Sequence, residues 1–115
     1  MTPAQAHEVL ETCRVPVFIA QSFAVRGDRL AFDGSDDTDQ ARDALDEVYA
    51  LLPIADPTAN EDLHLGCAAL MEATELGQEN LHGRQRRHFA SLTKRGVEHL
   101  SLALARLSDL ADLAA

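Results

Sequence analysis

Apolar side chains recur at helical spacing from the start of the chain. Thr2 followed by Pro3 is typical of a helix start, because threonine can cap the first backbone amides and proline suits the first helical position. The apolar positions that follow have the i, i+3, i+4, i+7 pattern of one helical face. They are Ala6, Val9, Leu10 and Cys13. The pattern predicts an amphipathic helix that ends before Pro16.

Residues 17–32 admit two interpretations. Two short apolar runs, at residues 23–25 and 30–32, flank a turn-forming stretch that contains glycine, as the strands of a hairpin flank a tight turn. We therefore expect a short N-terminal β-hairpin. The alternative is a short buried helix that begins at Pro16 and ends at Gly27.

Two further helices are expected in the middle of the chain. The first begins at Ser35, where a serine cap precedes several acids that suit the positive end of a helix dipole, and it stops before Pro53. The second begins at residues 56–58, where Glu61 completes a capping box with the threonine. Gly83 is the expected end of this helix.

A last apolar stripe runs through residues 84–113 and predicts a long C-terminal helix. Its members are Phe89, Leu92, Val97, Leu100, Leu104, Leu107 and Leu110. The chain has four Phe, one Tyr and no Trp, and Ala and Leu dominate it, which favours close packing of helix on helix. We expect a single, mostly α domain over residues 1–115, built as a small bundle of about four helices with a short hairpin near its N-terminus.

The formal net charge of −9 argues against nucleic-acid binding, because neutralising phosphates needs clustered Lys and Arg in a favourable field. The charges are unevenly placed along the chain. Residues 84–95 hold five of the ten positive charges and no acid, while residues 33–47 hold seven acids against Arg42 alone. Pairing between these two segments within the fold is one explanation of this pattern.

The arginines at residues 84–87 oppose the dipole of the predicted C-terminal helix, since its first turn is the positive end. An anion is therefore expected nearby. Carboxylates of the same chain or of a dimer partner, an acidic protein and a phosphorylated ligand are the candidate sources. The candidate anion-binding or partner-binding residues lie along one side of the helix and are Arg84, Arg87, His88, Lys94 and Arg95.

A Glu-x-x-His pattern occurs twice, as Glu61 with His64 and as Glu79 with His82. Carboxylate-bridged di-iron bundles present metal ligands in this way from one helical face. On the predicted helix these side chains face away from the leucine seam, and the two pairs are about 27 Å apart. An iron or zinc site at these four residues therefore requires an antiparallel dimer. Without that dimer Glu61 is a capping residue, and no cofactor is expected.

A second chain is expected as a partner. Leu65, Met71 and Leu76 border the acidic side of the third predicted helix rather than its main leucine seam. A monomer would therefore leave part of this apolar surface exposed to solvent. We expect a homodimer that covers it. An acidic protein or an anionic ligand at the arginine cluster is the other expected partner. No membrane contact is expected, because no apolar run reaches spanning length.

The two cysteines, Cys13 and Cys67, bear on the cellular compartment. Residues 1–14 lack the basic start and apolar core of a secretory signal, which indicates a reduced, cytoplasmic setting. In that setting two cysteines are typical of small buried apolar residues.

The expected function is non-enzymatic. The sequence contains no nucleophile motif, phosphate-binding loop or cofactor fingerprint, so no catalytic residue is assigned. A regulatory, adaptor or antitoxin-like protein-interaction module fits the segregated acidic and basic faces. Two alternatives stay open: a di-iron-type metal-binding protein that uses the Glu-x-x-His pairs across a dimer, and an enzyme or sensor that binds an anionic small molecule at the arginine cluster.

Overall fold

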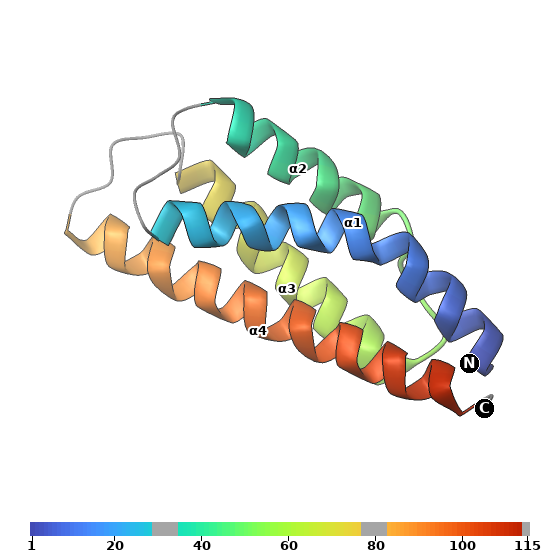
Figure 1. Cartoon of the computed structure of the whole chain (residues 1–115). Coiled ribbons are helices and arrows are strands. Elements are labelled where there is room, and N and C mark those ends of the chain that lie inside the picture. The colour runs from blue at the N-terminus through green and yellow to red at the C-terminus, as the bar shows by residue number, and fades with distance from the viewer. Residues whose placement is uncertain (29–34, 77–82, 114–115) are drawn as a thin grey trace.

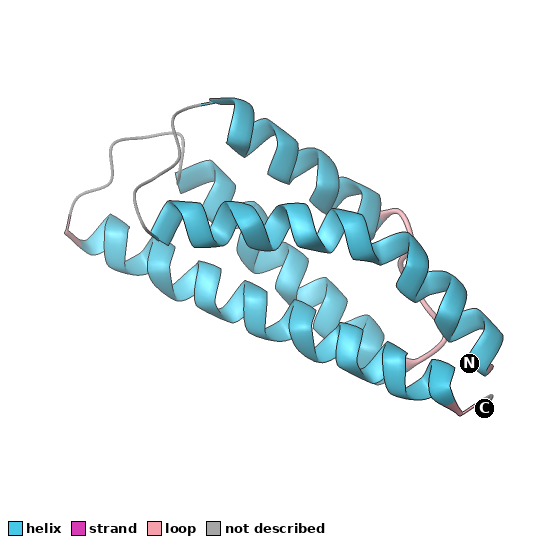
Figure 2. Cartoon of the chain, in the orientation of Figure 1, coloured by secondary structure: helices cyan, strands magenta, loops and turns pink. Residues whose placement is uncertain are grey.

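Four α-helices make up the part of the chain that the computed structural model describes, which is residues 1–28, 35–76 and 83–113 (Figure 1). The helices are α1 (Pro3–Asp28), α2 (Ser35–Tyr49), α3 (Pro57–Leu76) and α4 (Arg84–Asp112). Figure 2 shows helices joined by loops, and none of the described residues is in a strand. The predicted small, mostly α bundle is confirmed.

Consecutive helices run in opposite directions, and each packs against the next (Figure 1). α1 also packs against α4, so the four helices close into a bundle that is 48 Å long. The start of α1 lies beside the end of α4 (Figure 1). The start of α4 therefore lies at the opposite end of the bundle.

α1 is one continuous helix through Pro16, so the predicted helix end before that residue is wrong. The predicted β-hairpin is also wrong for residues 17–28, which are helical, while residues 29–32 lie outside the described part. A proline inside a helix costs about 3 kcal/mol, because it removes a backbone hydrogen bond and crowds the preceding turn. Burial of one uninterrupted apolar stripe along α1 offsets that free-energy cost. The helix changes direction near its middle, as is common at a proline (Figure 1). The stripe consists of Ala6, Leu10, Cys13, Val17, Ala20 and Ala24.

The core of the bundle comes largely from the predicted apolar stripes. Its fully buried members from α2, α3 and α4 include Leu45, Val48, Leu63, Leu70, Leu100 and Leu107. A smaller cluster joins α1 to the first half of α4, where the rings of Phe23 and Phe89 meet edge to face with centroids 6.1 Å apart. These contacts hold the beginning of α4 against its neighbours.

α3 and α4 approach each other closely at two glycines. A Cβ atom added to Gly96 would lie 2.4 Å from Cγ of Leu70, and one added to Gly66 would lie 2.8 Å from Cγ of Leu100. Each glycine thus makes room for a leucine of the opposite helix, and both leucines are completely buried. The sequence alone does not predict this role for either glycine.

Two polar pairs follow the register that the glycines set. Nδ1 of His99 lies 2.9 Å from Oδ1 of Asp62, and Nε2 of His88 lies 3.3 Å from Oε1 of Glu72. The residue numbers rise along α3 as they fall along α4, as an antiparallel pair requires. Both pairs lie on the outer side of the α3–α4 contact, where they are partly or largely exposed.

Asp56 caps the first backbone amides of α3 and is 8% exposed. Its Oδ2 accepts the backbone N–H of Ala59 at 3.0 Å, and Arg106 of α4 donates Nε–H and Nη2–H to the two carboxylate oxygens at 3.2 and 3.1 Å. The capping box predicted for Thr58 and Glu61 is therefore wrong, because the helix starts earlier. The hydrogen bonds from Arg106 and from the Ala59 amide lower the pKa of Asp56 below its usual value.

Replacing Gly96 with alanine is expected to destabilise the fold, although alanine favours a helix over glycine by about 1 kcal/mol. The new methyl group would overlap Leu70 and push the helices apart, and such overpacking costs about 1–3 kcal/mol. Chemical denaturation measures the free energy of unfolding. Ser91→Ala, at an exposed site of the same helix, is the control and should change it by about 0.5 kcal/mol or less. A Gly96→Ala protein more stable than the parent would contradict the close contact.

Asp56 should make the stability of the fold depend on pH. Because its folded pKa is lowered, its contribution is present at neutral pH and is lost as the pH falls from about 3.8 through the folded-state pKa. Asp56→Asn keeps a side-chain cap without the charge and should cost about 1 kcal/mol at neutral pH, a difference that disappears in acid. Asp56→Ala also removes the cap and should cost about 1 kcal/mol more. Denaturation curves across the acid range measure the stability of each variant relative to the parent. A difference between Asp56→Asn and the parent that does not vary with pH would contradict the charged pair with Arg106.

Candidate functional site

α4 begins at Arg84, directly after Gly83, whose φ of +53° lies in the left-handed region that suits glycine. No side chain caps the helix, and its first turn contains no acid. The predicted start of the fourth helix is confirmed, and Arg84, Arg86 and Arg87 stand at the positive end of its dipole. The predicted course of α3 beyond Leu76 lies outside the described residues until Gly83.

The basic residues predicted to bind an anion or a partner all face solvent. His88 has an acidic neighbour, since its Nε2 lies 3.3 Å from Oε1 of Glu72 on α3. The other members form no ion pair with any residue that the structure describes. We call the set the basic cluster, and it consists of Arg84, Arg87, His88, Lys94 and Arg95.

The acidic stretch that could neutralise the basic cluster from within the fold lies on α2. α2 packs mainly against α1 and α3, whereas the cluster lies on α4. No ion pair joins α2 to α4 over the described parts of both helices. The carboxylates at residues 39–47 therefore do not offset the cluster.

The metal-ligand candidates lie partly inside the described ranges. Glu61 and His64 are on the exposed side of α3, as predicted, and the His64 ring meets that of Tyr49 edge to face with centroids 6.0 Å apart. Glu79 and His82 lie outside the described residues. Over residues 1–28, 35–76 and 83–113, no group of three or more His, Cys, Asp or Glu side chains is placed to hold a metal ion. A site shared between two chains stays a prediction.

The apolar surface predicted beside the acidic side of α3 is smaller than expected. Met71 packs against the main core and Leu76 against the smaller cluster, because α2 and α4 flank α3 on both sides. Leu65 is the exposed member of the three, at 41%. The support for a dimer contact on α3 is correspondingly reduced.

Larger exposed apolar side chains lie on α1 and α4. Val15, Phe18 and Val25 of α1 are 66%, 70% and 48% exposed, and Leu102 of α4 is 57% exposed. The sequence does not predict this surface if residues 17–32 form a hairpin, because Val15, Phe18 and Val25 then do not share one helix. The sequence does contain a signal for this exposed face, because residues 15, 18, 22 and 25 recur at helical spacing on the side opposite to the buried stripe of α1.

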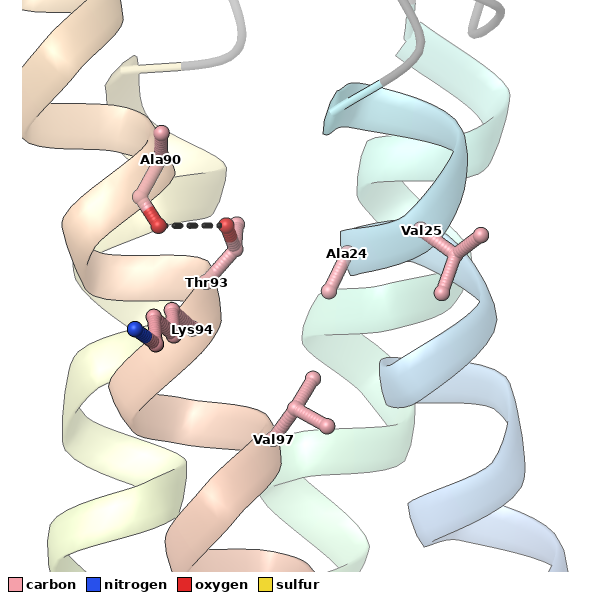
Figure 3. A pocket seen from close by; sticks show the side chains of 6 residues that line it. All are labelled: Ala24, Val25, Ala90, Thr93, Lys94 and Val97. Carbon is pink, nitrogen blue, oxygen red and sulfur yellow. Dashed lines mark hydrogen bonds between the residues drawn. The ribbon is translucent and has the colours of Figure 1, made fainter.

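A shallow groove runs between α1 and α4 along this surface. Figure 3 shows one hollow of it, about 320 Å³ in volume, which is lined by Ala24 and Val25 of α1 and by residues of α4 that include Lys94 and Val97. Two neighbouring hollows adjoin it, one lined by α1 alone and the other by α4 alone, and Gln21 donates Nε2–H to Oγ of Ser101 between the two helices at 3.0 Å. We call it the α1–α4 groove, and its lining residues are Phe18, Gln21, Ser22, Ala24, Val25, Arg26, Ala90, Thr93, Lys94, Val97, Glu98, Ser101 and Leu102.

The Thr93 hydroxyl in the groove is hydrogen-bonded within its own helix, and the two cysteine thiols of the chain are buried. The Thr93 hydroxyl in the groove donates to the Ala90 carbonyl of its own helix at 3.0 Å (Figure 3). Burial raises the pKa of Cys13 to about 11 and that of Cys67 to about 12, so both thiols are protonated at neutral pH. Both side chains are completely buried, which confirms their expected place in the core.

Comparison with protein-family models, with curated proteins and with solved structures finds no match for this chain. Over its described residues, none of the four helices is both long enough and apolar enough to cross a membrane. A functional proposal therefore rests on the basic cluster and the α1–α4 groove.

The Glu-x-x-His interpretation makes a direct prediction about metal. If Glu61, His64, Glu79 and His82 form a site across a dimer, the protein should bind stoichiometric Fe²⁺ or Zn²⁺ and His64→Ala should abolish the binding. We expect no stoichiometric metal, because Glu61 and His64 face solvent. Metal analysis after incubation and desalting measures it, with His7→Ala, an exposed histidine of α1, as the control. Metal that is kept by His7→Ala and lost by His64→Ala would overturn this expectation.

Proposed function

We propose that the chain is a non-enzymatic protein-interaction module, of regulatory, adaptor or antitoxin type, which binds an acidic protein surface through the basic cluster. The observation that carries the proposal is a set of exposed positive side chains near the start of α4 that have no carboxylate partner among the described residues. They are Arg84, Arg87, Lys94 and Arg95.

The electrostatics of the cluster favour an acidic partner. Positive charge at the positive end of a helix dipole raises the free energy of the unbound protein, and a partner's carboxylates relieve that repulsion. The chain as a whole carries a net charge of −9, so the cluster is a local exception on an acidic molecule. Such an exception orients an acidic partner during encounter and discriminates against basic ones.

The dimensions of the cluster favour an extended acidic surface over a small anion. Arg84 and Arg95 are about 16 Å apart along the axis of α4. One phosphate group contacts side chains within a few ångströms, whereas a protein segment with several carboxylates can follow the helix over this length. Lys94 belongs to both the cluster and the α1–α4 groove, so apolar contact area adjoins the charges.

Reversing two arginines tests the proposed function. The probe is a fluorescent peptide of consecutive glutamates, which stands in for an acidic protein segment. The parent should bind it with an affinity that falls with added salt, and the Arg84→Glu/Arg87→Glu variant should bind about tenfold or more weakly with a flatter salt dependence. Fluorescence anisotropy measures the binding. Circular dichroism should show unchanged helix content, because both side chains are exposed.

Arg14→Glu is the matched control for this experiment. Arg14 is an exposed arginine of α1, outside the basic cluster, whose Nη1 lies 3.4 Å from Oε1 of Glu11. Its reversal should leave peptide binding within about twofold of the parent. Equal losses in the control and the double variant would reveal a net-charge effect, and unchanged binding by the double variant would remove the proposal.

A further inference from the structure

The side of the bundle formed by α1 and α4 changes character along its length. Because the two helices are antiparallel, the start of α1 lies beside the end of α4 (Figure 1). Four exposed acidic residues lie at this end of the bundle, and we call this set the acidic end. They are Glu8, Glu11, Asp109 and Asp112. The basic cluster lies toward the other end of α4. The exposed apolar residues of α1 and α4 lie between the two. The side is thus mainly acidic, then apolar, then basic, with Arg14, which pairs with Glu11, and Glu98 as exceptions.

One stripe of α4 carries this change of character. It contains the groove residues Lys94, Glu98 and Ser101, and it continues in both directions at spacings of three and four residues, so its members share one face of the helix. Its first member is Arg87, its last is Asp112, and small side chains occupy most of the second half. In order the stripe is Arg87, Ser91, Lys94, Glu98, Ser101, Ala105, Ser108 and Asp112.

We infer that the partner is a second copy of this chain, docked antiparallel on the α1–α4 side. The two-fold axis crosses α1 near Ser22 and crosses α4 between Glu98 and Ser101. These positions lie at one level of the bundle, because Gln21 and Ser101 are hydrogen-bonded across the groove. The rotation sets the acidic end of each copy at the level of Arg84 and Arg87 of the other. This inference rests on the interaction role proposed above and identifies its partner.

The axis determines which residues of the two copies meet. On α1, it places Phe18 of one copy over Val25 of the other, and the reverse contact follows by symmetry. These side chains are 70% and 48% exposed in the single chain, so both contacts remove apolar surface from water. On α4, it brings Arg87 to the level of Asp112 of the second copy. Next to the axis, Glu98 of each copy meets Ser101 of the other, and Ala105 comes opposite Lys94.

The size of this side suits a stable dimer. A standard interface removes about 800 Å² per partner, which is roughly an eighth of the chain's accessible surface of 6632 Å². The bundle measures 48 × 23 × 21 Å, so one long side is large enough to supply that area. An apolar centre with charged ends is also the usual anatomy of a protein interface. α3 offers less exposed apolar surface for a dimer contact, because Leu65 is its one large exposed apolar side chain among the described residues.

The molecular mass in solution tests the inference. Sedimentation equilibrium at micromolar concentration should give twice the chain mass of 12.5 kDa. Phe18→Glu places a charge against Val25 of the second copy and should produce a monomer of unchanged helix content, since Phe18 is exposed in the single chain. Leu65→Glu, on the exposed surface of α3, is the matched control and should stay dimeric.

A charge exchange tests the orientation of the two copies. Arg87→Asp alone and Asp112→Arg alone should each raise the dimer Kd about tenfold, because the pair occurs twice in the dimer. The double variant restores both pairs with reversed sign and should return the Kd to within about threefold of the parent. Failure of the double variant to recover would overturn the antiparallel arrangement.

The remaining outcomes distinguish a failure of the dimer inference from a failure of the proposed function. A monomeric parent, a dimer that survives Phe18→Glu or a dimer broken by Leu65→Glu would each overturn the inference. A monomeric parent whose glutamate-peptide binding still needs Arg84 and Arg87 keeps the interaction role and points to a different acidic protein. A monomeric parent whose peptide binding ignores both arginines removes the inference and the proposed function together.

Discussion

The contact between Gly66 and Gly96 sets the distance between α3 and α4, and the rest of the bundle is built around that distance. Leu70 fills the space over Gly96, and Leu100 fills the space over Gly66. A slip or rotation of either helix would drive a leucine into the other backbone, which a close-packed interior does not accommodate. Buried packing therefore fixes the register, and the polar pairs on the surface, worth about 1 kcal/mol or less each, only follow it.

That register decides which residues of α4 meet solvent. With Gly96, Leu100 and Leu107 turned into the bundle, the stripe from Arg87 to Asp112 is turned outward. The positive charges at the start of α4 are then held where the dipole disfavours them, at about 0.3–1 kcal/mol each. Burial of each leucine contributes about 1.5–3 kcal/mol, so core packing wins over helix-end electrostatics. A local conflict of this kind is typical of a surface that another molecule completes.

The sequence predicts α2, the start of α3 near residue 57, and α4, because start signals and apolar stripes agree there. It fails for α1, where the local rule for Pro16 opposes a continuous buried stripe and the stripe prevails. Gly66 and Gly96 lie at buried positions of two predicted helices, but their contact joins distant segments and leaves no periodic trace. The exposure of the basic cluster follows from the helical wheel. The α1–α4 groove is not predicted because the expected hairpin interrupts α1 after Pro16, although residues 15, 18, 22 and 25 recur at helical spacing.

The length of α4 explains why its two charged ends cannot pair with each other within one chain. Arg87 and Asp112 are about 37 Å apart along α4, several times the Debye length of about 8 Å at physiological salt. A molecule that pairs both ends at once must lie along the whole side and carry the inverse sequence of charges. A different protein would need that inverse pattern by coincidence, whereas an antiparallel copy carries it by symmetry. The antiparallel dimer proposed above therefore accounts for the separation of charge along the α1–α4 side.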